Sequence, residues 1–581
     1  MKTSSNVSKS IQRTFNLFLL LDLKFPIFLY AFILLSSSVL LTGYRVYYEN
    51  QCLQIPLVFS LNNPSLYPND PFAATLPYYA SMLWKVVALG VRVIPLQPLL
   101  LTLFLLTRLL VIYTAGNLAR TFAPNSKLAV VGAMALFALP IEPILGSGTI
   151  VLPYFEQTSL SIAFFLLAIA SFYNSRPILW AIWLAIGFNL NSLYGIYALT
   201  YFGAVFLLDS TYRRAWKKWF LCFGLFLIIA FPVILFTLSA FGRNATNDQL
   251  WLVASQVRFP HHLYPLTWGK QEFSKFIVLI VLVIALLHQN RHRMQKLFKH
   301  GVIWAGISVL WLLYAFVAAY IAKSPSMLVM HPGRGTDLWY CFAGIALVST
   351  CAVNVEQSKG RLRQAILVAA FGSTILLWRP IIDPYILAVC LIALILQPVW
   401  YYILCKGSSS RLALLLTLGL LLVGALNFYS RLVDTKSLKD AFILEPPSAV
   451  EQIADWARTK ATIDAVFLVD PRWDYFRALA ERPVFVTWKD GSAILWDRTF
   501  VKAWTERLMA LGLDINQQGL DELKAINKLG SLYEKLDDED IKQLQSRFPM
   551  RYWVVPTKHP SSFPVAFQNS SYKVVELKSI R

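Results

Sequence analysis

Long apolar runs alternate with short polar connections over the first three quarters of this chain. Each run is about 15 to 22 residues long with few charges, which is the length at which an α-helix crosses the hydrocarbon core of a bilayer. We count about thirteen such runs, at 26–43, 98–118, 128–146, 158–173, 177–190, 193–208, 219–240, 274–288, 301–322, 338–354, 364–378, 385–404 and 411–428. The pattern predicts an α-helical, polytopic (multi-pass) membrane protein.

Lysine and arginine recur in every second connection, and this bias predicts the orientation. Basic loops stay in the cytoplasm, so the basic N-terminal segment 1–25 is expected inside. An odd number of spans then places the long loops 44–97 and 241–273 and everything after residue 430 on the outer face. We expect an integral plasma-membrane protein, in a bacterium the inner membrane, with its chemistry outside.

The chain divides into the cytoplasmic segment 1–25, a transmembrane core 26–430 and a polar region 431–581 that is long enough for one globular domain. The last region begins with helical periodicity from Ser448 to Thr459, with Ser448 as the expected cap. Strand patterns at 465–469, 483–486 and 552–555 alternate with helical ones at 497–511 and 535–547. This alternation predicts an extracytoplasmic α/β domain.

Charge and cysteine content exclude several classes of protein. The net charge of +21 lies largely in the predicted inner loops, so it indicates membrane topology and contact with anionic lipids, and no nucleic acid partner is expected. Of six cysteines only Cys52 falls in a predicted outer loop, which leaves no disulfide framework and no paired metal spacing there. We expect Cys52 to be a small buried residue. No phosphate-binding loop or dinucleotide fingerprint is present.

The first outer loop contains the segment Asp70-Pro71-Phe72. An irregular stretch, 54–69, precedes it, and a largely apolar helical segment, 72–93, is expected to lie along the membrane interface after it. A carboxylate before proline caps a helix well, so Asp70 has a structural interpretation. The alternative is a catalytic carboxylate held just above the bilayer.

The outer loop from Met330 to Asp337 combines two glycines, a proline and several side chains able to bind ligands. Arg334 can hold a phosphate bidentately, glycines let a backbone approach an anion, and His331 and Asp337 are close in sequence. Alternatively, the loop only turns the chain, Asp337 caps the next span, and Arg334 contacts lipid headgroups.

Other charged residues leave their roles open. Arg258 is followed closely by His261 and His262. The adjacency of the two histidines does not imply that they bind a metal together. Arg258 and one histidine could bind a diphosphate or the acceptor, or all three residues could lie at the surface. Arg108 lies within a span, where a charge must pair or face a wet cavity.

The arrangement of the whole chain resembles the GT-C glycosyltransferases. The shared features are a long first outer loop with an acid, an interfacial helix after it, a second acid in the next outer loop, many spans and an outer C-terminal domain. The segments 69–72, 334–339 and 486–491 also resemble a family of uncharacterised bacterial multi-pass membrane proteins.

The resemblance implies a membrane glycosyltransferase, a hexosyl or pentosyl transferase that moves a sugar from a polyprenyl-phosphate donor to a glycan, lipid or protein acceptor of the cell envelope. Asp70 then takes the position of the general base, and Glu142 or Glu156 that of the second acid. The donor phosphate or substrate would contact Arg334, His331, Asp337, Arg258 and His262. No residue is assigned as a metal ligand, although the family is compatible with a divalent cation such as Mg²⁺ or Mn²⁺.

Two other classes of function compete with this enzyme. A transporter or flippase would use the same charges as a translocation path, but the chain shows no internal repeat, and Arg108 is the charge that lies deep in a span. A non-catalytic envelope assembly protein would use the outer domain to recruit partners. The sequence favours the enzyme.

Overall fold

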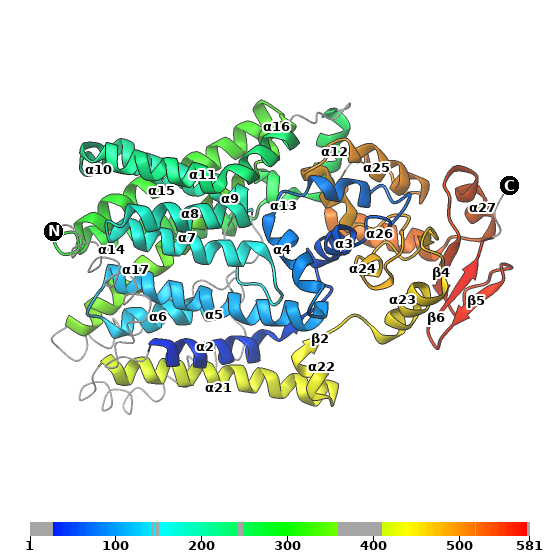
Figure 1. Cartoon of the computed structure of the whole chain (residues 1–581), viewed down its shortest axis with the longest axis horizontal. Coiled ribbons are helices and arrows are strands. Elements are labelled where there is room, and N and C mark those ends of the chain that lie inside the picture. Colours follow the sequence, from blue (N-terminus) through cyan, green and yellow to red (C-terminus); the bar gives the residue numbers. More distant parts are fainter. Residues whose placement is uncertain are drawn as a thin grey trace, which may run out of the picture.

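The computed structural model describes residues 27–140, 145–146, 150–241, 248–357, 409–517 and 519–577. The N-terminal segment, Glu142 and the predicted spans 364–378 and 385–404 lie outside these ranges. The molecule is elongated, with a bundle of roughly parallel helices in one half and the C-terminal region in the other (Figure 1).

The described helices of the bundle follow the predicted apolar runs closely. They are α2 (Ile27–Thr42), α5 (Leu96–Phe122), α6 (Lys127–Ala138), α7 (Gln157–Tyr173), α8 (Pro177–Leu190), α9 (Ser192–Leu208), α11 (Trp216–Phe241), α14 (Lys270–Gln289), α15 (Gln295–Phe316), α17 (Asp337–Gln357) and α21 (Ser409–Thr435). Short helices join some of them, namely α10 (Ser210–Arg214), α13 (Pro260–Leu263) and α16 (Pro325–Leu328), and a π turn, η3 (Val317–Ile321), extends α15.

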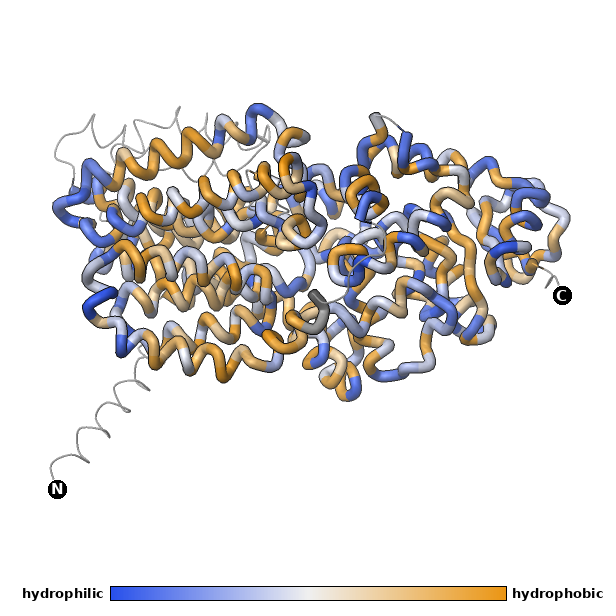
Figure 2. The backbone as a smooth tube through the Cα atoms, turned by 90° about the horizontal axis from the view of Figure 1, so that it is seen from above, coloured by the Kyte–Doolittle hydropathy of each residue, from blue (hydrophilic) through white to orange (hydrophobic). Residues whose placement is uncertain are grey.

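The outer surface of the bundle is apolar, as expected of a protein in lipid. In the described part of the chain, six helices are long and apolar enough to cross a membrane. On α11, the side chains of Leu221, Ile228 and Leu238 are largely exposed. Hydrophobic residues accordingly run along the helices of this half, whereas the other half is mixed (Figure 2). Exposed apolar faces of this extent are stable in hydrocarbon and not in water.

The first span and the chain leading to the outer domain are tied together. Helices α2 and α21 pack side by side, and β1 (Tyr44–Arg45) pairs in parallel with β2 (Ile443–Leu444). The guanidinium of Arg431 donates to the carbonyl oxygens of Leu40 at 2.6 Å and Leu41 at 2.9 Å. These bonds occupy carbonyl groups that the end of α2 leaves without helical partners.

The first outer loop differs from its prediction in two ways. A helix, α3 (Gln51–Asn62), occupies much of the stretch expected to be irregular. Its residues from Gln51 to Val58 are all buried, so no alternation of polar and apolar positions marked it as a helix. The expected helix 72–93 is broken into η1 (Ala73–Tyr78) and α4 (Met82–Val91), because Tyr79 takes an extended conformation that brings its hydroxyl to two glutamines.

The C-terminal region is an α/β domain, as predicted. Its elements are α22 (Leu438–Phe442), α23 (Ser448–Lys460), β3 (Phe467–Leu468), α24 (Phe476–Ala480), η5 (Lys489–Leu495), α25 (Phe500–Ala510), α26 (Glu522–Glu534), α27 (Asp538–Arg547), β4 (Tyr552–Pro556), β5 (Val565–Gln568) and β6 (Tyr572–Glu576). The strand order is β3-β4-β6-β5, parallel between β3 and β4 and antiparallel elsewhere.

Some details of this domain correct the sequence interpretation. Helix α23 begins at Ser448 and has Pro447 at its cap position, so Ser448 does not cap it. The segment 483–486 makes a single bridge, from Val484 to Phe467, in place of a strand. Two strands, β5 and β6, and helix α26 were not predicted. Their sequences are short and polar, and they are ordered by packing against the rest of the domain.

Two hydrophobic cores hold the half of the molecule that contains the C-terminal domain. One lies beside the sheet and is built within the domain, from residues such as Ile453, Phe467 and Val554. The other is shared: Trp84 of the first outer loop and Trp251 of α12 (Asp248–Arg258) join Trp504 of the C-terminal domain. The domain therefore packs on the outer loops of the bundle through a continuous apolar contact.

Candidate functional site

The carboxylate of Asp70 is buried and fully engaged. One oxygen accepts the backbone N–H groups of Phe72 at 3.0 Å and Ala73 at 3.4 Å, which confirms the capping interpretation. The other accepts the Nε–H of Arg477 at 2.7 Å and the N–H of Val484 at 3.1 Å. A carboxylate with these four donors has no free acceptor position for a substrate proton. In this structure Asp70 is engaged by structural contacts, and its predicted role as general base stays a prediction.

Arg258 is likewise held by the C-terminal domain. Its guanidinium contacts the carboxylate of Glu522 and donates to the hydroxyl of Ser492 at 3.1 Å. His261 Nδ1 lies 3.0 Å from the same glutamate. These bonds join α12 and α13 to α26 and η5, so Arg258 acts as an interdomain contact where a ligand contact was expected.

The predicted loop around Arg334 is ordered as η4 (Pro332–Thr336) and is held by one face of α9. The hydroxyl of Tyr197 lies 2.6 Å from the carbonyl oxygen of Met330, and that of Tyr201 donates to the carbonyl of Gly335 at 2.7 Å. Tyr194 contacts the carboxylate of Asp337. Spacings of three and four residues place these tyrosines on one helix face. The sequence interpretation missed this row, although its spacing was visible.

The two glycines of this loop make room for indole rings. A Cβ on Gly333 would lie 2.9 Å from the ring of Trp268, and one on Gly335 would lie 2.4 Å from that of Trp311. The glycines were expected to let the backbone approach an anion. Their neighbours show that they instead allow tryptophans to pack against the loop.

Arg334 is surrounded by histidines. Its Nη2 lies 3.5 Å from Nε2 of His262, whose Nδ1 is 3.0 Å from the carbonyl oxygen of Gly146. The buried Nε of Arg334 and Nδ1 of His331 have no hydrogen-bond partner among the described residues. Burial, with the charge of Arg334 added, lowers the pKa of His331 to about 3 and that of His262 well below its usual value. Both imidazoles are therefore neutral at pH 7. The one N–H of His262 lies on Nδ1 and donates to the carbonyl oxygen of Gly146, so its Nε2 is an acceptor that faces Arg334.

Glu156 is the predicted acid that the structure brings to this region. One carboxylate oxygen accepts the N–H of Thr158 at 2.6 Å and caps α7. Burial raises the pKa of Glu156, while its bonds to Thr158 and the charge of Arg334 oppose the rise. The position of the other candidate, Glu142, is outside the described residues. Asp337 is buried at the start of α17 and engaged by Tyr194.

Three polar side chains, those of Gln54, Tyr79 and Gln157, bond to one another near Glu156. The hydroxyl of Tyr79 accepts from the side-chain amides of Gln54 at 3.1 Å and Gln157 at 3.0 Å. The amide of Gln54 also reaches the carboxyl of Glu156. The Oε1 of Gln54 is buried and has no partner among the described residues, so it can accept a hydrogen bond from Glu156 when that carboxyl is protonated. The first and second outer loops thus meet at this carboxyl.

Glu49, a residue that the sequence interpretation did not single out, is a second carboxylate of the first outer loop. Its side chain is 48% exposed and contacts the ammonium of Lys489. Burial opposes ionisation of Glu49, but Lys489 outweighs it and lowers the pKa. Burial raises the pKa of Tyr154, and the charges of Glu156 and Glu49 both raise it further. Tyr154 therefore lies in the field of two carboxyls whose pKa values shift in opposite directions, as acid and base pairs in enzymes do.

A cleft of about 140 Å³ opens beside this region. It is lined by residues of α9, α11, α16 and the C-terminal domain, among them Ile196, Met330 and Trp496. The ring of Trp496 packs edge-on against Tyr79 at a centroid distance of 5.0 Å. Trp496 therefore separates the cleft from Tyr79, and the cleft lies on the side of the apolar helices.

A resident metal was compatible with the sequence. In the part of the chain that the structure describes, no group of three or more His, Cys, Asp and Glu side chains is placed to bind a metal ion. The transfer step proposed below is written without a metal ion.

Comparisons with known proteins place the chain beside ArnT. The family model "Domain of unknown function (DUF6798)" matches residues 448–511. No curated protein matches the chain. The crystal structure of ArnT from Cupriavidus metallidurans bound to undecaprenyl phosphate is similar with a TM-score of 0.39 and 14% identity, over 94% of this chain and 96% of ArnT. The apo structure gives 0.40 and 12%, over 94% and 97%.

Proposed function

We propose that this chain is a membrane glycosyltransferase of the GT-C superfamily that moves a sugar from a polyprenyl-phosphate donor to an extracytoplasmic acceptor. The observation that carries the proposal is Arg334. It is charged and mostly buried, no carboxylate among the described residues forms an ion pair with it, and its buried Nε has no partner. A guanidinium in such a place is stable when an anion occupies the space before it.

The phosphate of the donor fits this space. Arg334 offers parallel N–H groups that match two phosphate oxygens, and the neutral ring of His331 can add one N–H. Arg334 and His331 lie directly before the start of α17, and a phosphate attached to a lipid would be found at such a helix end. Positive charge there also stabilises the phosphate as it departs.

Glu156 is the proposed general base. It takes the proton of the acceptor hydroxyl, whose oxygen forms a bond to the anomeric carbon of the sugar. The bond between that carbon and the phosphate oxygen breaks, and its electron pair leaves with the phosphate at Arg334. A carboxyl with a raised pKa is a stronger base than an exposed one, which suits it to this step.

The cleft beside Trp496 is the proposed access for the lipid. It is bounded by α9 and α11, and Leu235 and Leu238 of α11 are exposed on the lipid-facing surface. A polyprenyl chain can remain in the bilayer against these residues while its phosphate reaches Arg334. The proposal includes the predicted orientation, with the C-terminal domain on the outer face and membrane lipids around the bundle.

The buried charge in the membrane core has a structural explanation. Arg108 is 3% exposed and donates to the hydroxyl of Ser38 at 3.0 Å and to the carbonyl of Leu152 at 2.5 Å. It is therefore satisfied within the bundle, as predicted. Glu156 caps the start of α7 and Arg334 precedes the start of α17, so both lie at helix ends. Their position favours a reaction at the outer surface over a path through the membrane.

The proposal is tested by transfer of radiolabelled sugar from a panel of polyprenyl-phosphate donors by the purified protein in nanodiscs, with and without a chelator. The first lipid to test is undecaprenyl phosphate, the ligand in the ArnT structure. We expect transfer by the wild type, and its loss in Glu156→Gln and Arg334→Ala but not in the exposed control Glu534→Gln. Wild-type protein that binds none of these lipids and transfers no sugar would rule the function out.

A further inference from the structure

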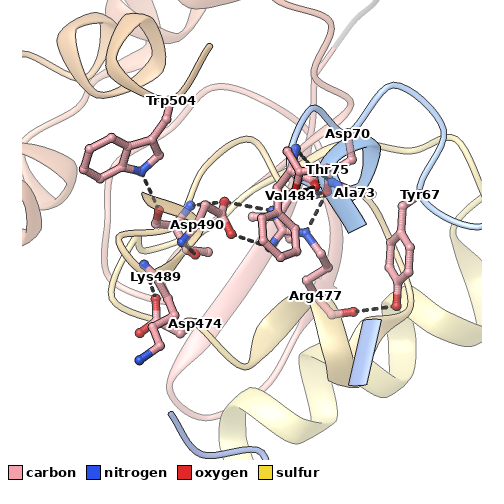
Figure 3. A network of polar contacts seen from close by, with 12 residues as sticks. Tyr67, Asp70, Ala73, Thr75, Asp474, Arg477, Val484, Lys489, Asp490 and Trp504 are labelled. Atoms are coloured by element: carbon pink, nitrogen blue, oxygen red, sulfur yellow. Dashed lines mark hydrogen bonds and ion pairs between the residues drawn. The ribbon is translucent and has the colours of Figure 1, made fainter. Parts of the chain in front are cut away.

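Arg477 of the C-terminal domain is the centre of a buried ion cluster that reaches the first outer loop (Figure 3). Its side chain is 1% exposed and lies between the carboxylates of Asp70 and Asp490. Nη1 and Nη2 donate to the two oxygens of Asp490 at 2.6 and 2.9 Å, while Nε donates to Asp70 at 2.7 Å. The guanidinium also packs on the ring of Phe72 at 4.5 Å. Its contacts with Asp70 and Phe72 join the C-terminal domain to the first outer loop, and its contact with Asp490 anchors it within the domain.

The cluster fixes the turn that precedes η5. Asp490 accepts the N–H of Thr487 at 2.8 Å, and Trp504 donates to the carbonyl of Thr487 at 3.2 Å. Between these residues, the N–H of Lys489 donates to the carboxylate of Asp474 at 3.0 Å (Figure 3). The backbone on both sides of Lys489 is thus held, and the direction of its side chain is set by Arg477 through Asp490.

The side chain of Lys489 crosses to Glu49. The segment that carries Glu49 lies against the second outer loop, since the ring of Tyr48 packs on that of Tyr154 at a centroid distance of 5.7 Å and the amide of Gln51 donates to the carbonyl of Phe155 at 3.2 Å. Lys489 is 12% exposed and Glu49 is 48% exposed, so the carboxylate keeps access to solvent while the ammonium does not. The other groups that face Glu49 are Arg258 of α12, Glu522 of α26 and Tyr154 of the second outer loop. Lys489 is the group that contacts the carboxylate of Glu49 directly.

We propose that Arg477 and Lys489 are positioning residues of the transfer site, through which the C-terminal domain holds the carboxylate of Glu49 in place beside Tyr154 and Glu156. The inference rests on the proposed function and extends it to the role of the domain. An ionised, half-exposed carboxylate can accept hydrogen bonds from hydroxyl groups of the acceptor and orient it toward Glu156. The domain is then a part of the site and not a separate binding module.

The first test is the pH dependence of transfer, because a merely structural contact would leave it unchanged. Glu156, whose pKa is raised, sets the main acid limb of kcat/KM, and Glu49, whose pKa is lowered, adds a second protonation at lower pH. Replacing Lys489 by methionine removes the positive charge at Glu49, so this second protonation should move up by about 1 pH unit and shift and steepen the limb. Lys489→Arg should restore the wild-type profile, and in Glu49→Gln the limb should follow Glu156 alone. An acid limb that stays in place in Lys489→Met would overturn the proposal.

The second test does not depend on activity and separates this inference from the proposed function. In Arg477→Met and in the milder Arg477→Lys, hydrogen exchange at the amides of 487–496 and of α3 should be at least tenfold faster than in the wild type. The control Arg472→Met removes an exposed arginine of the same domain and should leave these amides protected. Protected amides in both Arg477 variants would refute the positioning role, whether or not any donor is turned over.

Discussion

The carboxylate of Asp70 and the guanidinium of Arg477 meet at 2.7 Å across 407 positions of the sequence. Neither side chain is accessible to solvent by more than 1%. Charges removed from water to this extent are stable only when each has a partner, and here Asp490 completes the set. The pair explains why an acid that resembles a catalytic residue in the sequence has a structural role.

Removing Arg477 should therefore destabilise the outer half of the molecule. Arg477→Met leaves Asp70 and Asp490 buried without a counter-charge, and we expect a loss of about 3–5 kcal/mol. The unfolding midpoint in denaturant, followed by tryptophan fluorescence, measures this loss. Arg472→Met removes the ion pair of Arg472 with Asp470, in which the arginine side chain is 38% exposed. Its loss should cost less than about 1 kcal/mol of stability. Equal stability of the two variants would contradict the structural role.

Asp70 and Glu156 should respond differently to removal of their charge. Asp70→Asn breaks the ion cluster, so the melting temperature should fall. Glu156→Gln keeps the shape of the side chain and should lower kcat by about 10²–10⁴-fold with little change in melting temperature, because it removes a proton acceptor. Transfer assays and thermal scans on both variants give the comparison. Folded Asp70→Asn protein without activity, beside active Glu156→Gln, would return the base to Asp70.

Gly335 offers a test of the loop that carries Arg334. In Gly335→Ala the new methyl group would lie 2.4 Å from the ring of Trp311, so the ring or the loop must move. We expect a cost of about 1–3 kcal/mol and weaker binding of undecaprenyl phosphate. Gly306→Ala on the same helix as Trp311 meets open space and is the matched control. Ligand binding is measured by the shift in melting temperature that the lipid produces, which should shrink in Gly335→Ala alone.

The spans could be predicted because a single property, an apolar run of sufficient length, decides them. The α/β character of the C-terminal region was predictable for a similar reason, from strand and helix patterns such as those at 465–469 and Ser448 to Thr459. Helix α3 was missed since it is buried on all faces and has no polar side to reveal its period.

The site was harder to predict because its contacts join distant segments. Arg334 was singled out from its charge and its glycine-containing loop, and Glu156 was suggested, with Glu142 as an equal alternative, by the resemblance to GT-C glycosyltransferases. Nothing local to Asp70 indicates that Arg477 will occupy it, and nothing local to Glu49 indicates that Lys489 will lie beside it. Both contacts result from the packing of the C-terminal domain on the first outer loop. Neither hydropathy nor motif spacing predicts this packing.

The stability of the outer domain should depend on pH through Asp474. Burial raises the pKa of this carboxyl to about 7, although Lys489 opposes the rise. In the unfolded chain its pKa is about 4. Because this pKa is raised in the folded state, the native protein binds the proton more tightly than the unfolded chain does. The stabilisation that Asp474 contributes is therefore complete below pH 4 and is lost as the pH rises through 7. Over this window the loss is at most about 1.4 kcal/mol per pH unit.

The Asp474→Asn variant isolates this contribution from those of other groups, because asparagine keeps the shape of the side chain without its titration. We expect the wild type to lose stability relative to Asp474→Asn between pH 5 and pH 8, as measured by the difference in their free energies of unfolding at each pH. A difference that stays constant over this range would show that Asp474 titrates alike in the folded and unfolded chains. A difference that changes with the opposite sign would mean that Lys489, rather than burial, controls the carboxyl.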